Sequence, residues 1–257
     1  MMFPLRVAVL ALLLPSGVYG QALGSYRPQR DTIAYESLNT YLMFFVRGAD
    51  TLGEPVTTRT RERQHIAARG TELVVWVGLQ SLDGQPFSFD DTYTITPGGR
   101  VTAVGTKPVT EAPNARVDLL PRFPDPTATL AVGLSWRDTV AVRHSLPYGD
   151  TYYSVQRQFR VQRLIDTLGT RVAHIVATGT MRLRQGGWQD SSAGTVWWQE
   201  VAGPVADTVW FDTRGGALIG DVTVMRLMGT GGAGPKSGGA TMPSGLYSLV
   251  RRQRSRS

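Results

Sequence analysis

The sequence predicts an all-β protein made of curved antiparallel sheets, arranged as a half-barrel or a sandwich. Three observations favour this class. Beyond residues 1–20, no window longer than about ten residues repeats its apolar positions with the helical period. Short runs rich in β-branched and aromatic residues recur along the chain, separated by turns that contain Gly, Pro and Asp. Hydrophobic residues make up 42% and charged residues 18%, which is typical of a folded globular chain.

Residues 1–20 have the pattern of a cleavable secretory signal. Arg6 supplies the positive charge, and Val7 to Leu14 is an unbroken apolar run that is too short to cross a bilayer. Val18-Tyr19-Gly20 then offers a cleavage site before Gln21. We therefore expect an exported bacterial protein, located in the periplasm or outside the cell.

The cysteine count and the charge distribution exclude several classes of protein. The chain has no cysteine, which excludes disulfides, thiolate metal sites and anchoring through a lipidated cysteine. Its net charge is +7, but Arg6, Lys236 and four arginines among the last seven residues account for most of that excess. The rest of the chain is nearly neutral, so no nucleic-acid partner is expected. No cofactor, no metal and no transmembrane helix in the mature chain are predicted either.

Residues 21–104 are expected to form a first β unit. Tyr41–Val46 and Glu72–Val77 are apolar on both faces, which predicts buried strands. Val56–Ile66 alternates polar and charged residues, as an edge or solvent-facing strand would. The unit is completed by the strands Phe87–Ile95 and Val101–Val104, joined at the hairpin turn Pro97-Gly98-Gly99-Arg100.

The second half of the chain is expected to contain a connector, a second β unit and a tail. Five prolines in residues 105–130 predict a connector, because proline cannot donate to a sheet ladder. Residues 131–228 are expected to form the second unit, and residues 229–257 a flexible Gly-rich, Arg-rich tail with room for one last strand. The strands predicted in the second unit are Thr151–Leu164, Val172–Ala177, Thr178–Leu183, Thr195–Val201, Val205–Phe211 and Ala217–Leu227.

Two turn sequences recur at nearly equal offsets. Asp50-Thr51-Leu52-Gly53 matches Asp166-Thr167-Leu168-Gly169, and Gly98-Gly99 matches Gly215-Gly216. The matches suggest that the two β units are related by duplication. Chance is the competing explanation, because such turns are common.

No catalytic constellation is predicted. The histidines, His65, His144 and His174, are far apart in sequence, and no nucleophile elbow is present. Asp90-Asp91 favours a turn or bulge over a calcium site, because no second acidic cluster lies nearby in the sequence. A hydrolase that uses paired carboxylates remains the alternative, and the residues considered for that role are Asp90, Asp91, Asp190 and Asp212.

The tryptophans offer the candidate ligand-binding residues. Neighbouring residues on a strand face opposite sides, so one ring of Trp197-Trp198 should face the core and the other solvent or a cavity. An exposed indole is a platform for an apolar ligand, although packing under a loop would also explain it. The residues predicted to bind a ligand are Trp197, Trp198 and Trp136.

A stretch around Trp136 carries a resemblance to a known group. Residues 121–126 form a proline-rich segment, and Val132-Gly133-Leu134-Ser135-Trp136-Arg137-Asp138-Thr139 follows it. Over residues 120–228 this arrangement resembles exported bacterial β-rich proteins of unknown function, similar to the periplasmic lipoprotein carriers. The resemblance implies a curved sheet and transfers no catalytic residue. The absence of a lipid-anchoring cysteine departs from the anchored members of that group.

The function that the sequence favours is non-enzymatic binding. Curved sheets with strands that are apolar on both faces would form a cradle for an apolar ligand, a lipid or an envelope protein partner. The alternative is the carboxylate-dependent hydrolase acting outside the cytoplasm. An outer-membrane protein that crosses by strands would need an apolar outward band and aromatic girdles, and the polar end of the chain speaks against it.

Overall fold

The computed structural model describes residues 22–83, 88–108, 121–124, 129–146, 149–167, 169–190, 195–235 and 240–255, so the predicted signal at residues 1–20 lies outside the described residues. The described residues form thirteen strands and no helix, and none of them belongs to a helix that could cross a membrane. The strands are β1 (Ile33–Arg47), β2 (Asp50–Leu52), β3 (Val56–Arg69), β4 (Glu72–Ser81), β5 (Ser88–Ile95), β6 (Val101–Val104), β7 (Lys107–Pro108), β8 (Ser135–Leu146), β9 (Gly149–Thr167), β10 (Thr170–Asp190), β11 (Thr195–Asp212), β12 (Ala217–Pro235) and β13 (Ala240–Arg254).

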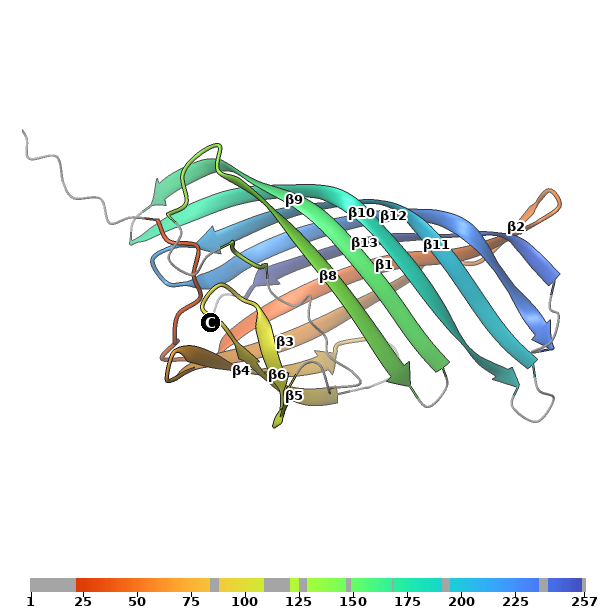
Figure 1. The fold of residues 1–257 in the computed structure, drawn as a ribbon, viewed down its shortest axis with the longest axis horizontal. Helices are drawn as coiled ribbons and strands as arrows, with labels where there is room; N and C mark the ends of the chain where they lie inside the picture. Colours follow the sequence, from red (N-terminus) through yellow and green to blue (C-terminus); the bar gives the residue numbers. More distant parts are fainter. Residues whose placement is uncertain are drawn as a thin grey trace, which may run out of the picture.

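All thirteen strands belong to one antiparallel sheet. Its order is β7-β6-β5-β4-β3-β1-β13-β12-β11-β10-β9-β8, and β2 pairs with β1 outside this path. Figure 1 shows the long strands side by side in a strongly curved sheet, with the β1–β2 hairpin projecting at one end. The prediction of an all-β protein with a curved antiparallel sheet is confirmed.

The C-terminal strand lies in the middle of the sheet. β13 pairs with β1 on one side and with β12 on the other, so Leu249 faces Thr40 and Val224. The structure therefore differs from the flexible tail predicted for residues 229–257. The glycines make room here, because a Cβ on Gly231 would lie 2.6 Å from the Phe45 ring. Backbone pairing on both sides orders a stretch whose composition is typical of a linker.

The strands are also longer than predicted. β10 has 21 residues and β11 has 18, so each spans two strands that the sequence had separated by a turn. Gly203 lies in the turn expected within β11, and Gly179 lies beside the break expected within β10; a Cβ on Gly179 or Gly203 would lie 1.9 Å or 2.1 Å, respectively, from a carbonyl oxygen of the neighbouring strand. Glycine within a strand permits a tight bend or a close backbone approach. At these two positions it accommodates curvature instead of ending the strand.

β3 is an interior strand, not an edge. It pairs with β1 and with β4, and its side chains alternate between two environments. Glu62 and Gln64 are buried, whereas Arg59 and Arg63 are exposed. The alternation of polar residues led to the prediction of an edge or solvent-facing strand. It arises because part of the inward face of β3 borders a polar interior.

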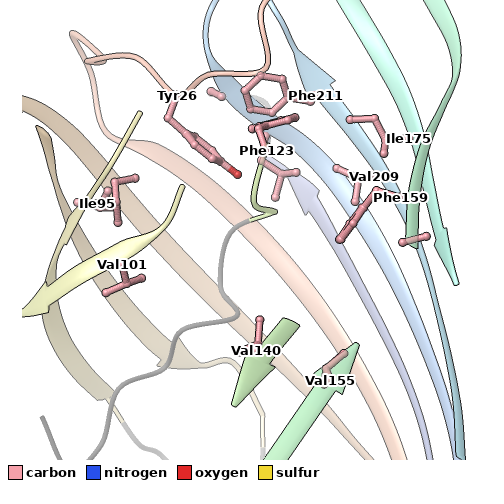
Figure 2. Packing of buried hydrophobic residues seen from close by; sticks show 14 of the residues in the cluster. Tyr26, Ile95, Val101, Phe123, Val140, Val155, Phe159, Ile175, Val209 and Phe211 are labelled. Atoms are coloured by element: carbon pink, nitrogen blue, oxygen red, sulfur yellow. The ribbon is translucent and has the colours of Figure 1, made fainter. Parts of the chain in front are cut away.

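An aromatic core closes the end of the sheet opposite the β1–β2 hairpin. Tyr26 and Phe123 come from segments outside the strands and pack against Phe211 of β11, with ring centroids 5.3 Å and 4.8 Å away. Figure 2 shows these rings together among the aliphatic side chains of the surrounding strands. Trp136 stacks on Phe159 at 5.2 Å in the same core. This end of the concave face is therefore filled by the protein itself.

Candidate ligand site on the concave face

A contact between distant strands identifies the concave face. Met43 of β1 and Gln185 of β10 are separated by three strands in the sheet, yet Nε2 of Gln185 lies 3.6 Å from the Met43 sulfur. In a flat sheet, four strand spacings would hold them about 19 Å apart. Side chains that meet in this way must lie inside the curve, and strand alternation assigns the other side chains from there.

Arg252 of β13 forms the centre of a buried ionic cluster on this face. Its Nε donates to Asp221 Oδ1 at 2.7 Å, and its NH1 lies 3.3 Å from Glu62 Oε2. The arginine side chain is only 9% exposed. Burial alone would lower the pKa of this guanidinium, but the two carboxylates outweigh that cost and raise the pKa above its ordinary value. Arg252 is therefore a fixed cation.

A second pair lies across the same space. NH1 of Arg157 donates to Asp207 Oδ2 at 3.2 Å, and Asp207 also accepts a 2.6 Å hydrogen bond from the Thr223 hydroxyl. The Asp207 side chain is 4% exposed. The buried Nε of Arg157 has no hydrogen-bond partner among the described residues. This nitrogen is an unused donor in a largely satisfied network.

These two clusters surround a cavity of about 410 Å³, which we call the ionic cavity. Its wall is drawn from eight strands, as expected for the inside of a curved sheet. Glu62, Asp221, Arg157 and Arg252 supply its charges, and each is engaged in an ion pair. Paired charges of this kind give a polar cavity without a free cation or carboxylate in its described wall.

Two glutamines lie across the concave face between the ionic cavity and the hairpin end. Gln185 Nε2 donates to Gln199 Oε1 at 2.9 Å, and Gln199 Nε2 donates to the Gly245 carbonyl at 3.2 Å. Gln199 is fully buried. The inward side chains of β1 show the same sequence of regions along the strand: Asn39 lines the ionic cavity, and Met43, closer to the hairpin, contacts Gln185.

Beyond the glutamines lies an apolar pocket of about 410 Å³, which we call the hairpin pocket. The β1–β2 hairpin and the ends of β11, β12 and β13 form it. Among the described residues its wall carries no charged side chain, and those that line it are Met43, Phe45, Leu52, Trp197, Gly232, Ala233 and Met242. Ser244, opposite Phe45 on the next strand, is fully buried, and its hydroxyl has no partner among the described residues. The pocket has the size and character of a site for a small apolar ligand.

The structure separates the three tryptophans proposed from the sequence. Trp197 lines the hairpin pocket, whereas Trp198 lies against Gly186 on the opposite face; both also border a groove that contains Tyr152. Trp136 is 7% exposed in the aromatic core, and its indole nitrogen donates to the Arg122 carbonyl at 2.9 Å. Of the three, Trp197 is the one that lines an apolar pocket.

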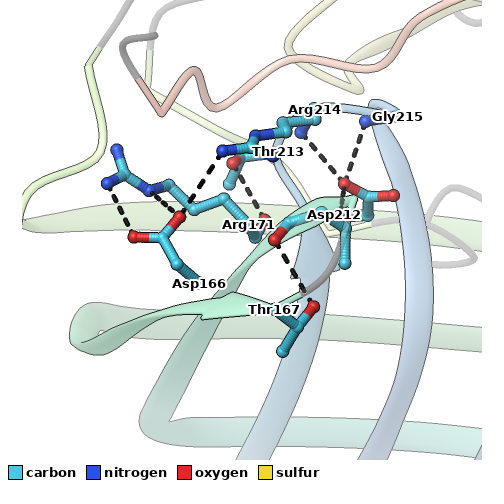
Figure 3. A network of polar contacts seen from close by, with 8 residues as sticks. Asp166, Thr167, Arg171, Asp212, Thr213, Arg214 and Gly215 are labelled. Carbon is cyan, nitrogen blue, oxygen red and sulfur yellow. Dashed lines mark hydrogen bonds and ion pairs between the residues drawn. The ribbon is translucent and has the colours of Figure 1, made fainter. Parts of the chain in front are cut away.

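Asp50-Thr51-Leu52-Gly53 lies in the β1–β2 hairpin, whereas its match after Asp166 and the turn at Gly215-Gly216 lie at the other end of the sheet, where polar contacts hold them. Asp166 receives two hydrogen bonds from Arg171, which lower the pKa of its carboxyl, and lies 3.7 Å from Arg214 (Figure 3). Asp212 accepts hydrogen bonds from the backbone nitrogens of Arg214 and Gly215. These contacts order the β9–β10 and β11–β12 turns and leave both carboxylates with structural roles.

The two Gly-Gly turns both close on one dipeptide, Tyr26-Arg27. The Tyr26 nitrogen donates to the Pro97 carbonyl at 2.7 Å, and the Arg27 nitrogen donates to the Gly216 carbonyl at 3.1 Å. Gly99 and Gly216 have positive φ, and a Cβ at either would collide with this dipeptide. Whatever its evolutionary origin, the recurrence gives two matching docking points for the N-terminal segment.

Of the carboxylates considered for hydrolysis, those whose side chains the structure describes do not form a group. Asp90 and Asp91 are consecutive on β5, and Asp91 accepts a hydrogen bond from Tyr93. Asp212 lies in the turn described above, while the side chain of Asp190 lies outside the described residues. His174 stacks on Trp210 on the convex face, and His65 pairs with Trp76 across β3 and β4. Within the described residues, no group of acidic or histidine side chains has the arrangement of a metal site.

The sequence reasoning missed the residues of the ionic cavity. A signal was present, because Asp207 lies between Val205 and Val209 at the inward positions of β11. Arg157 lies in the same way between Val155 and Phe159 on β9. A single charge within an apolar face indicates either a buried ion pair or a wrong register. The partner of such a charge lies on another strand and is not visible in the local pattern.

Comparison with known proteins adds one structural likeness. No family model matches the chain, and no curated protein matches it. Among solved structures, the chain is similar to a DUF1329 family protein from Desulfovibrio piger, at 10% sequence identity and a TM-score of 0.16. The match covers 86% of this chain and 84% of the other. Neither value is high enough to transfer a fold or a function.

Proposed function

We propose that this protein binds an apolar molecule or a lipid chain in the hairpin pocket and has no catalytic role. The observation that carries the proposal is a concave pocket of about 410 Å³ whose described wall is apolar and includes Phe45, Trp197 and two methionines. Ligand pockets typically have volumes of this order and a mostly apolar lining. From the predicted signal at residues 1–20, we further propose that binding takes place outside the cytoplasm.

The ends of the concave face support this choice of site. The aromatic core around Phe123 fills one end, and the ionic cavity next to it is lined by charges that are already paired. Transfer of an apolar chain into the ionic cavity would remove water from those charges, which is costly. In the hairpin pocket the same chain would cover apolar side chains, and each buried methylene contributes about 0.8 kcal/mol.

The test pairs two adjacent tryptophans. We expect Trp197→Ala to weaken binding of parinaric acid to the purified chain by about tenfold to a hundredfold, because a large aromatic contact is lost. Trp198→Ala removes the same ring from the opposite face and should leave binding within about twofold. Fluorescence titration gives both dissociation constants, and melting curves verify that both variants fold.

A second variant fills the hairpin pocket instead of removing a contact from it. Ala233→Trp adds an indole to the pocket wall and should abolish parinaric acid binding. Mass spectrometry of organic extracts from the purified wild-type protein should then find an apolar molecule that the filled variant lacks. Equal affinities for wild type and Ala233→Trp would contradict the proposal.

A further inference from the structure

The convex face of the sheet carries an apolar ridge along its three central strands. Strand alternation places Leu38, Leu42 and Phe44 of β1 on this face, opposite the inward Met43. Leu42 pairs with Tyr247, and Phe44 meets Met228 across Gly245. Leu38 is 41% exposed and Met228 is 59% exposed. The apolar ridge is defined by Leu38, Leu42, Phe44, Met228, Tyr247 and Leu249.

Exposed arginines surround this ridge. One cross-strand row shows the pattern: Leu38 lies between Arg59 of β3 and Arg251 of β13. The same row continues through Val222 and ends at Arg160 of β9. A row of this width extends for about 29 Å, at about 4.8 Å per strand.

Several exposed arginines of this face form no ion pair within the part of the chain that the structure describes. They include Arg59, Arg160, Arg182, Arg226 and Arg251. Glu36, an acidic neighbour on this face, is already paired with Arg61 at 3.2 Å. Arg226 lies over the Tyr247 ring at 5.9 Å, so cation and apolar ridge are in direct contact. The face therefore combines unneutralised positive charge with exposed apolar side chains.

We propose that the convex face docks on the surface of an anionic lipid bilayer. Guanidinium groups bind phosphate oxygens in pairs, and each basic residue near an anionic leaflet adds about 1 kcal/mol. Leucine, phenylalanine and tyrosine favour the boundary between headgroups and acyl chains. A hollow of about 260 Å³ beside Leu38 is lined by Arg59, Arg251 and Arg254, and also by Glu36, whose carboxylate is paired with Arg61; it can receive a headgroup. This inference concerns the face opposite the hairpin pocket and does not depend on ligand binding there.

The test measures co-sedimentation of the full chain with vesicles. We expect binding to phosphatidylcholine vesicles that contain phosphatidylglycerol, little binding to pure phosphatidylcholine, and weakening of the interaction by added salt. The triple variant R59Q/R226Q/R251Q should bind the anionic vesicles roughly a hundredfold more weakly. The matched variant R30Q/R47Q/R100Q removes the same number of charges from loops and a hairpin, and should lose less than about threefold.

A second variant tests the apolar ridge separately. L38Q/M228Q changes two exposed side chains, and should weaken vesicle binding about tenfold without reducing its salt dependence. Melting curves verify folding of every variant. Equal losses in the two arginine triples, equal binding to neutral and anionic vesicles, or binding to heparin without binding to vesicles would each overturn the proposal.

Discussion

The concave and convex faces of this sheet use the same residue in opposite ways. Arg252 and Arg251 are consecutive on β13 and therefore point to opposite faces. Arg252 is buried between Glu62 and Asp221, whereas Arg251 is exposed and forms no ion pair with a described residue. The difference arises because successive side chains on a strand point to opposite faces of the sheet. Arg252 therefore lies inside the curve with buried carboxylates, and Arg251 lies outside it, exposed to solvent.

The contrast matters energetically because water screens one face and not the other. A buried charge loses its hydration and persists only with a well-placed partner. An exposed arginine keeps its hydration and contributes little to folding, whether it is paired or not. Substitution of an arginine on the concave face should therefore lower the free energy of unfolding far more than substitution of a neighbouring arginine on the convex face.

The largest effect is expected at the ionic cluster. Arg252→Met removes the shared cation and leaves Glu62 and Asp221 buried without it, so the free energy of unfolding should fall by about 3–5 kcal/mol. Arg251→Met changes the same side chain on the other face and should alter stability by no more than about 0.5 kcal/mol. Urea denaturation of both variants gives the comparison. Similar losses at the two positions would show that the faces do not differ as described.

Replacing the whole cluster sharpens this result. In Glu62→Gln/Asp221→Asn/Arg252→Met no charge remains to be compensated, and the triple variant should recover most of the stability lost by Arg252→Met. Recovery would identify the loss as the cost of uncompensated carboxylates. If the triple variant were as unstable as the single one, lost packing of the arginine stem would be the cause.

A smaller effect is expected on β11. Asp207→Asn keeps the shape of the side chain but withdraws the charge that faces Arg157, which should cost about 1–3 kcal/mol. Glu200→Gln is the matched change on the exposed face of the same strand, and it should be neutral within about 0.5 kcal/mol. Thermal melts at neutral pH distinguish the two. A neutral Asp207→Asn would mean that solvent reaches Arg157 and screens it.

Which segments form strands could be predicted from the sequence, whereas the pairing of those strands in the sheet could not. Tyr41–Val46 and Glu72–Val77 were recognised because β-branched and aromatic runs predict strands wherever they pair. The strand through Gly203 was divided in two, because glycine has the same local signature in a turn and in a bend. The central place of β13 depends on register with strands more than 180 residues earlier in the chain, which no local pattern reports.

In the candidate site, too, the direction of side chains could be predicted from the sequence, whereas contacts between strands could not. The alternation rule predicted that the two rings of Trp197-Trp198 point in opposite directions, and they do. It could not say that Met43 and Met242 would meet Trp197, because they come from three different strands. Arg157 and Asp207 lie on strands that are not neighbours, and β10 runs between them, so no local sequence pattern reports that they meet.

The smallest predicted effect concerns a histidine on the convex face. His174 stacks on Trp210 at 5.6 Å, and partial burial, followed by the nearby charge of Arg163, lowers its pKa below the ordinary value of about 6.5. Below that pH the unfolded chain binds a proton that the folded chain resists, so stability should fall as pH drops from about 6.5 through the folded pKa. His174→Gln should remove this pH-dependent loss, which urea midpoints measured between neutral and mildly acidic pH would detect. Arg163→Gln should shrink the loss without abolishing it, because burial against Trp210 remains. A steeper acid dependence in His174→Gln would contradict the assignment, since it would mean that His174 is stabilised in its charged form.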